Sequence, residues 1–198
     1  MSNLVTMLSS IKAEKNYFIE KLEKVNGYSE REIAEIEKLN NISIHGQLKE
    51  FLITMGKCSG GLFLGDDFYI YRYYRNAGFN IQRQKNLMAD EELAINYREN
   101  GEKLDLAEEQ YFEICGENEH ANIFFMYTKD DNDNDNDNDY VYEWNENTNT
   151  VKRFGTLFNY LIRYRKSLGS YSTQGTIRGD EDSALFDELT TGRLLLSN

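Results

Sequence analysis

The N-terminal part of the chain repeats its apolar residues about every 3.6 positions, which is the period of an α-helix. These residues are Leu4, Met7, Leu8, Ile11, Phe18, Leu22 and Val25. The spacing predicts one amphipathic helix of about 22 residues, closed by Asn26-Gly27, because glycine readily adopts the conformation that ends a helix.

Two further helices are predicted before any strand. Ser29 and Glu32 match a capping box, and Tyr28 and Ile33 occupy the positions of a hydrophobic staple, so a helix is expected over residues 29–39. The third helix begins near Gly46 and ends at Gly56, with apolar positions at i, i+3, i+4 and i+7. Those positions are Leu48, Phe51, Leu52 and Met55.

The pattern then changes to glycine pairs and aromatic runs, which are typical of strands and turns. Strands are expected near residues 60–65, 68–73, 111–115, 122–128, 140–144 and 150–154, and a helix over 87–99. Short Gly/Asn turns between successive strands favour an antiparallel meander. A last helix is predicted over residues 157–168, with Arg163, Arg165 and Lys166 in its final turns. The tail from Gly169 is expected to be polar and loose, with one short helix over residues 184–189.

Composition indicates a globular protein. The 198 residues are 40% hydrophobic and 13% aromatic, and no apolar stretch approaches the ~20 residues of a membrane span. The first residues lack the pattern of a signal peptide, so we expect a soluble, cytoplasmic protein. The chain has no proline, and Cys58 and Cys115 are expected to be reduced, mostly buried thiols.

The net charge of −12 is unevenly distributed. Residues 87–146 carry 19 acidic and 3 basic side chains, a local net charge of −16. Such a field repels nucleic acid and anionic lipid, and a basic partner is its natural complement. Composition alone favours the simpler interpretation that the acid keeps the protein soluble.

Residues 130–139, which we call the Asp/Asn segment, are an almost pure alternation of Asp and Asn. Carboxylates at alternate positions resemble an EF-hand loop, but position 6 is Asn136 rather than Gly and position 12 is Tyr142 rather than Glu, if Asp131 is position 1. The preferred interpretation is an expanded, solvated hairpin tip, so no specific metal site or other cofactor is predicted. Weak, unselective binding of divalent ions by so many like charges is left open.

No group of residues matches an active site. The possible soft metal ligands His45, Cys58, Cys115 and His120 occur singly, and no nucleophile elbow or phosphate-binding glycine loop is present. Adjacent carboxylates such as Asp66-Asp67 are common in a chain with 34 acidic residues and carry no argument for catalysis. Tyrosines in the predicted strands, interleaved with acid, are instead typical of a protein-binding face.

The order of elements and several motifs resemble the SUKH superfamily, over roughly residues 29–166. The capped helix 29–39 and the apolar helix ending at Met55-Gly56 carry part of this resemblance. The other motifs are Ser59-Gly60-Gly61-Leu62-Phe63-Leu64-Gly65-Asp66-Asp67, Phe124-Phe125-Met126-Tyr127, residues 140–144 and Phe154-Gly155-Thr156-Leu157-Phe158. The family commonly has a proline before the apolar helix, where this chain has His45-Gly46.

The resemblance implies an α+β fold, with a single twisted antiparallel sheet, N-terminal helices and a C-terminal helix packed around it. It divides the chain into a leading helix (residues 1–27), a SUKH-like domain (28–168) and a polar tail (169–198). Bacterial members of the family are largely immunity proteins that bind a toxin, often a nuclease, whereas fungal members regulate cell-wall synthesis.

We therefore expect a non-catalytic immunity protein that binds a basic cognate toxin, with no nucleic-acid or membrane partner; the oligomeric state is left open. The alternative is a regulatory or scaffolding module, and a small hydrolase is disfavoured. The residues predicted to contact the partner are Asp66, Asp67, Tyr71, Glu117, Glu119, Asp131, Asp133, Asp135 and Tyr142.

Overall fold

A computed structural model describes most of the chain outside the segment between Tyr71 and Tyr111. The described residues are 3–12, 20–64, 68–71, 111–117, 122–128, 139–145, 150–167 and 183–195. The helices are α1 (Asn3–Ser9), α2 (Glu30–Asn40), α3 (Gly46–Met55), α6 (Leu157–Ser167) and α7 (Ser183–Thr190), with short 3-10 turns η1 (Leu22–Lys24) and η2 (Tyr69–Tyr71). The strands are β1 (Tyr111–Glu117), β2 (Asn122–Tyr127), β3 (Tyr140–Asn145) and β4 (Thr150–Thr156).

The four strands form one antiparallel sheet in the order β1-β2-β3-β4, which confirms the predicted α+β class and meander. Register shifts interrupt the ladder between Glu113 and Cys115 and between Val141 and Tyr142. Such bulges increase the local twist of a sheet. The predicted helix over residues 87–99 lies outside the described residues.

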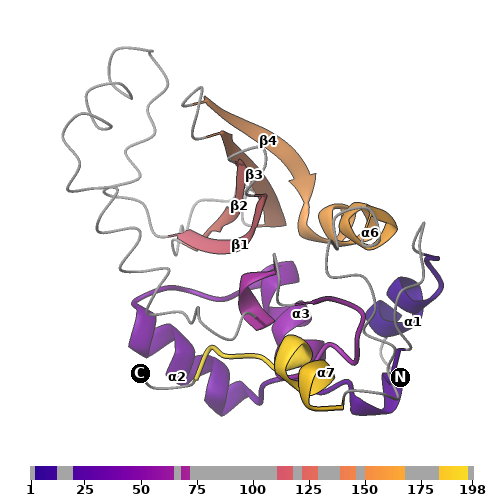
Figure 1. The fold of residues 1–198 in the computed structure, drawn as a ribbon. Coiled ribbons are helices and arrows are strands. Elements are labelled where there is room, and N and C mark those ends of the chain that lie inside the picture. Colours follow the sequence, from indigo (N-terminus) through magenta and orange to yellow (C-terminus); the bar gives the residue numbers. More distant parts are fainter. Residues whose placement is uncertain are drawn as a thin grey trace.

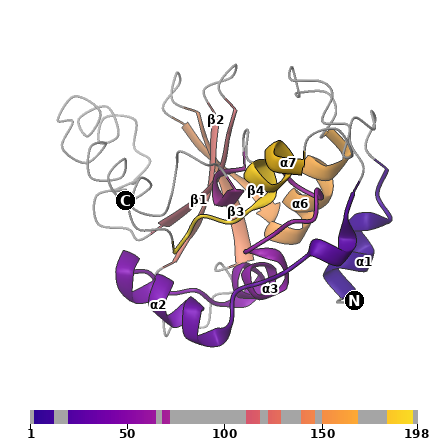
Figure 2. The same ribbon diagram turned by 60° about the horizontal axis from the view of Figure 1, so that its bottom comes forward.

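The helices form a layer against one face of the sheet. Figure 1 shows α3 directly beneath the strands, with α2 and α7 farther from them and α6 beside β4. In Figure 2, α2, α3 and α1 lie side by side below the sheet. A single buried cluster joins this layer to the sheet, including Phe51 of α3, Phe124 and Met126 of β2, and Leu161 of α6.

The start of α2 is as its capping box predicts. The Ser29 hydroxyl oxygen accepts a hydrogen bond from the Glu32 backbone N–H at 3.4 Å, and the Glu32 carboxylate accepts one from the Ser29 N–H at 2.9 Å. Lys57 Nζ lies 2.6 Å from the Glu32 carboxylate. Its hydrogen bond is the main reason that the pKa of Glu32 falls to about 2, with a further contribution from Ser29.

We expect Ser29→Ala to lower the free energy of unfolding by about 1 kcal/mol, because it removes an N-cap acceptor. Urea unfolding followed by circular dichroism measures this. Ser43→Ala is the matched control, since the Ser43 contact in this fold is made by its backbone N–H, and it should change stability by less than about 0.5 kcal/mol. Equal stabilities for Ser29→Ala and the wild type would contradict the capping role.

The predicted N-terminal helix is wrong in its length. It ends at Ser9, and the hydroxyls of Ser9 and Ser10 donate to the carbonyls of Thr6 and Met7. Serine side chains bonded to nearby carbonyls compete with helix continuation. Gly27 does not end a helix either: a Cβ there would lie 1.6 Å from the Ile53 carbonyl oxygen, so this glycine allows a close approach to α3.

The C-terminal tail is more ordered than predicted over residues 183–195. The short helix exists as α7, and the residues after it pack onto the body of the protein. Thr191 bridges to Cys58, the Gly192 N–H donates to the Lys57 carbonyl at 2.9 Å, and the Leu194 N–H donates to the Tyr28 hydroxyl at 3.2 Å. Leu194 and residues of α1 belong to the main buried cluster, so the predicted leader and tail share the core of the central domain.

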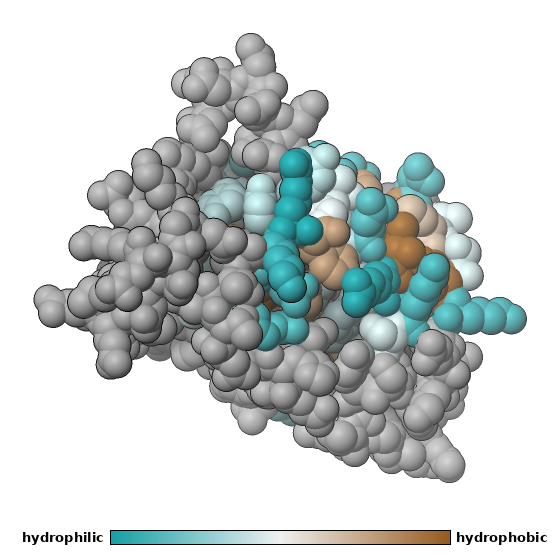
Figure 3. Space-filling model, turned by 90° about the horizontal axis from the view of Figure 1, so that it is seen from above, coloured by the Kyte–Doolittle hydropathy of each residue, from teal (hydrophilic) through white to brown (hydrophobic). Residues whose placement is uncertain are grey.

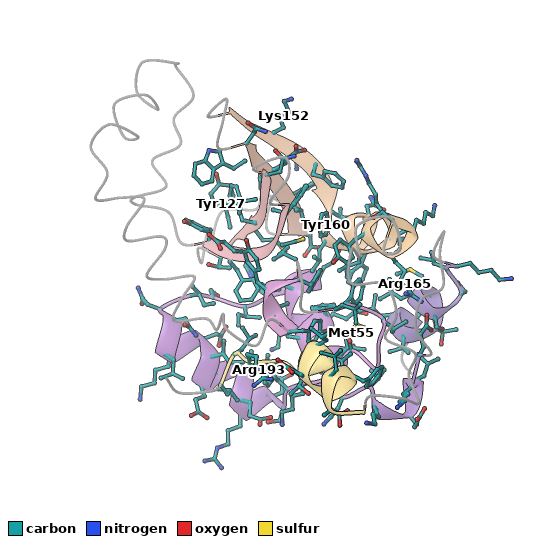
Figure 4. The ribbon with its side chains drawn as sticks, viewed as in Figure 1. Met55, Tyr127, Lys152, Tyr160, Arg165 and Arg193 are labelled. Atoms are coloured by element: carbon teal, nitrogen blue, oxygen red, sulfur yellow. The ribbon has the colours of Figure 1, made fainter. Side chains whose placement is uncertain are left out.

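Arg165 lies in the last turn of α6, as predicted, and its side chain is buried. It is 2% exposed and forms an ion pair with Glu20. Burial lowers its pKa to about 10. Figure 4 shows Arg165 between α6 and α1, so this pair fastens the N-terminal part of the chain to α6.

Candidate functional site

Most of the predicted partner-binding residues lie outside the described part of the chain. These are Asp66, Asp67, Glu119, Asp131, Asp133 and Asp135. Glu117 ends β1, but its side chain is not described. The structure therefore places only Tyr71 and Tyr142 of that set.

Tyr71 was predicted wrongly as a surface residue. It lies in η2 rather than in a strand, is 0% exposed, and donates from its hydroxyl to the Met55 carbonyl at 2.8 Å. Burial raises the pKa of this phenol well above its ordinary value. The aromatic run that suggested a strand instead fills the core, and a partner cannot reach Tyr71 in this fold.

Tyr142 lies on the sheet face opposite α6. Its ring is 5.8 Å from Phe125 and 4.8 Å from Tyr127, and Tyr127 and Tyr142 are both half-buried. Figure 4 shows Tyr127 on this side of the sheet and Tyr160 on the other. Trp144 belongs to the same cluster and is buried. This face therefore offers two partly accessible tyrosines next to the strand ends that the Asp/Asn segment connects.

The described residues at the two ends of this connection are held by the region around the start of α3. After β2, the Thr128 carbonyl accepts a hydrogen bond from the Ser43 N–H at 2.9 Å. Before β3, the Asp139 carboxylate accepts one from the Gln47 N–H at 2.6 Å. Thr128 is 0% exposed, so the chain leaves the sheet from a buried position.

Asp139 supplies a cap that α3 otherwise lacks. The N-cap residue His45 makes no side-chain hydrogen bond to the helix, and the first turn of α3 contains no acidic residue. The first backbone N–H groups of a helix need external acceptors, and a carboxylate there also interacts favourably with the helix dipole. Asp139 meets both needs from a position 92 residues away in sequence.

Gly46 explains how the carboxylate reaches the helix. Its φ is +51°, a conformation that L side chains rarely adopt, and a Cβ there would lie 2.1 Å from Asp139 Oδ1. The His45-Gly46 pair at the start of α3 is thus matched to Asp139.

Gln47 extends the connection to α6. Its backbone N–H donates to Asp139, and its side-chain oxygen accepts a hydrogen bond from the Phe158 N–H at 2.8 Å in the first turn of α6. We call this set the α3 junction: Ser43, Gln47, Thr128, Asp139 and Phe158. It ties Thr128 and Asp139, which flank residues 129–138 in the sequence, to the start of α3, and Gln47 links that region to α6.

We expect Asp139→Ala to lower the free energy of unfolding by about 1 kcal/mol, because α3 loses its acceptor. Asp139→Asn keeps a side-chain oxygen and should cost less. Urea unfolding of the two variants beside the wild type measures the difference. An Asp139→Ala variant as stable as the wild type would show that this cap contributes nothing.

The excess charge of the protein lies outside the described residues. The described part contains 13 acidic and 13 basic residues and is neutral. The remaining 21 acidic and 9 basic residues account for the whole net charge of −12. Along the sequence, the excess of acid is concentrated in residues 87–146, with 19 acidic and 3 basic side chains.

Comparison of the chain with protein-family models, with curated proteins and with solved structures finds no match. Among the described residues, no cluster of three or more His, Cys, Asp or Glu could hold a metal ion, and Cys58 and Cys115 are free thiols. In the same residues no helix has the length and apolar character of a membrane span.

Sequence reasoning missed the role of Asp139. It treated residues 130–139 as one solvated tip, because every acidic residue in an alternating segment looks equivalent. The positive φ of Gly46 and the missing acid at the start of α3 are the only local signals that an acceptor must come from elsewhere.

Proposed function

We propose that the protein is a non-catalytic binding protein that neutralises a cognate toxin by presenting an acidic surface to it. The observation that carries the proposal is the concentration of charge along the chain: residues 87–146 carry 19 acidic and 3 basic side chains, a net charge of −16, whereas the remaining residues have a net charge of +4. A protein whose acid served solubility alone would need no such concentration.

The α3 junction supports this proposal because its hydrogen bonds hold Thr128, just before the Asp/Asn segment, and Asp139, the last residue of that segment. Charged groups on a fixed base lose less conformational freedom on binding than groups on a free tail, so more of their attraction appears as affinity. Thr128 and Asp139 provide such a base. Tyr127 and Tyr142 lie on the adjacent strands and are the described side chains best suited to pack against a partner next to the acid.

The resemblance to the SUKH superfamily supports an immunity role in a bacterial cytoplasm. A nuclease toxin must present a cationic surface to its phosphate substrate. An acidic inhibitor would be steered to that surface and would cover it before nucleic acid could bind.

Co-purification with the toxin domain encoded by a neighbouring gene tests the proposal. We expect a stable complex in which the toxin domain loses its activity, and growth of cells that carry both genes. A neighbouring toxin domain that neither binds nor is inhibited would contradict the proposal, and the absence of any adjacent toxin gene would favour the regulatory or scaffolding alternative.

A further inference from the structure

One part of this acidic protein is entirely basic. Residues 150–167, which form β4 and α6, contain five basic and no acidic side chains. Arg165 is buried against Glu20 and does not contribute to the surface. The other four, Lys152, Arg153, Arg163 and Lys166, are exposed.

Three of these cations follow one line from β4 to α6. The Arg163 guanidinium lies over the Phe154 ring, 4.7 Å from its centroid. Lys152 lies opposite Glu143, and Glu143 lies opposite Phe124, so these side chains share one face of the sheet. Phe154 is on the same face, with its ring 5.6 Å from that of Phe124. Lys166 is three residues after Arg163, and residues three apart share a helix face. We call Lys152, Arg163 and Lys166 the basic row. Arg153 is separate, because it stacks on Tyr140 at 3.3 Å.

The basic row faces outward. Figure 4 shows Lys152 near the end of β4 that is far from the helical layer, with its side chain directed away from the body. Figure 3 looks down on this side and shows long hydrophilic side chains projecting beside hydrophobic ones. Stacking on Phe154 restrains the Arg163 guanidinium, so less conformational entropy is lost when it binds an anion.

The row is free of ion pairs within the described residues. Four other described cations, Lys24, Lys49, Lys57 and Arg165, do form ion pairs, with Asp187, Glu30, Glu32 and Glu20. None of these pairs uses the basic row. Lys152 lies opposite Glu143 in the β3–β4 ladder without forming an ion pair with it.

The backbone beside the row is a possible pairing surface. Among the described strands, β4 lies at the edge of the sheet, so no described strand pairs with its outer side. An extended peptide can add to such an edge through main-chain hydrogen bonds, while side-chain contacts determine which peptide binds. Lysine on an edge strand can also serve to prevent unwanted pairing.

We propose that the basic row and the outer edge of β4 bind an acidic, extended segment of a partner polypeptide. Carboxylates of that segment would meet Lys152, Arg163 and Lys166, and its main chain would pair with β4. The residues of this surface lie in β4 and α6, outside residues 87–146 to which the proposed toxin contact is assigned, and the inference does not depend on that contact.

A polypeptide fits this surface better than nucleic acid does. Nucleic-acid binding rests on many phosphate contacts, about 6–10 in strong complexes, whereas the row has three cations. A long polyanion would also extend into the field of a protein with a net charge of −12. A short acidic segment can make the local contacts and avoid the rest of the field, because screening limits the field to about 8–10 Å at physiological salt.

Fluorescence anisotropy with a labelled peptide of alternating glutamate and threonine tests the proposal. We expect binding at about 50 mM salt that weakens at about 300 mM. The variant K152E/R163E/K166E should lose at least about tenfold in affinity. The control K12E/R31E/K38E makes the same change in net charge at three exposed positions elsewhere, and it should stay within about twofold of the wild type.

Three results would overturn the proposal. The first is an equal affinity of the peptide for K152E/R163E/K166E and for the control K12E/R31E/K38E. If charge reversal prevents folding, K152Q/R163Q/K166Q replaces the first of these variants. The second is tighter, row-dependent binding of oligothymidylate, which would indicate nucleic acid. The third is row-dependent self-association in sedimentation velocity without peptide binding, which would indicate a second copy of the chain.

The edge position has its own test. A peptide with N-methyl groups at alternate backbone nitrogens keeps its carboxylates but cannot donate the same main-chain hydrogen bonds. We expect it to bind at least about tenfold more weakly than the unmethylated peptide. Equal binding of the two peptides would contradict pairing along β4.

Discussion

Replacing Phe51 by alanine is expected to lower the free energy of unfolding by about 3–5 kcal/mol. Phe51 is 0% exposed and joins α3 to the aromatic residues that follow it. Its ring centroid lies 5.9 Å from that of Phe63 and 5.8 Å from that of Phe68. Because natural domains are stable by only about 5–15 kcal/mol, this change would remove a large part of the total.

Chemical denaturation measures the loss, and Leu39→Ala is the control. Leu39 is also a large apolar residue on a helix, but it is 64% exposed, and its truncation should change stability by less than about 0.5 kcal/mol. Similar losses for the two variants would mean that the core is not centred where the buried cluster places it.

Replacing Asp131, Asp133 and Asp135 by asparagine is expected to slow association with the toxin domain by about tenfold or more at low salt. Asparagine has nearly the same size as aspartate and already alternates with it in this segment, so the change removes charge and little else. Stopped-flow or surface-based kinetics would show the effect in the association rate rather than in the dissociation rate.

The matched control is E23Q/E35Q/E50Q. These three glutamates are exposed, lie outside residues 87–146, and their neutralisation changes the net charge by the same amount. We expect association to slow by less than about threefold, because steering depends on where the charge is. If both variants slowed association equally, overall charge and not the acidic segment would be responsible.

Local patterns predicted the elements whose signals are local. The capping box located the start of α2, Gly46 and Gly56 bounded α3, and alternation with short turns located all four described strands. The capping box and the glycines act within a few positions, and each strand shows its alternation within its own segment, so a single sequence displays these signals.

The features that the sequence did not predict depend on contacts between residues far apart in the chain. Tyr71 is predicted to contact a partner, but it is buried and its hydroxyl donates to the Met55 carbonyl. The ion pair that joins buried Arg165 to Glu20 likewise has no signal in the helix pattern. The order of the tail depends on pairing with Cys58, and the cap of α3 depends on Asp139. Each contact joins distant parts of the chain, and no local pattern specifies it.

The sequence shows where the excess negative charge lies, but it does not show the hydrogen bonds that hold the chain at the two ends of the Asp/Asn segment. Counting acidic residues located the surplus in residues 87–146. Only the structure shows that Asp139, at the end of the Asp/Asn segment, caps α3. Only the structure shows that Gln47 links this cap to α6. The proposed toxin contact combines the two findings.

The most direct test of the proposed acidic binding surface is the salt dependence of association between the intact protein and the basic toxin domain that the proposed function assigns to a neighbouring gene. The account predicts a rate constant well above the neutral range of about 10⁵–10⁶ M⁻¹s⁻¹ at about 50 mM salt, falling steeply as salt rises to about 300 mM. A rate constant that does not change with salt, or no association at any salt, would contradict it.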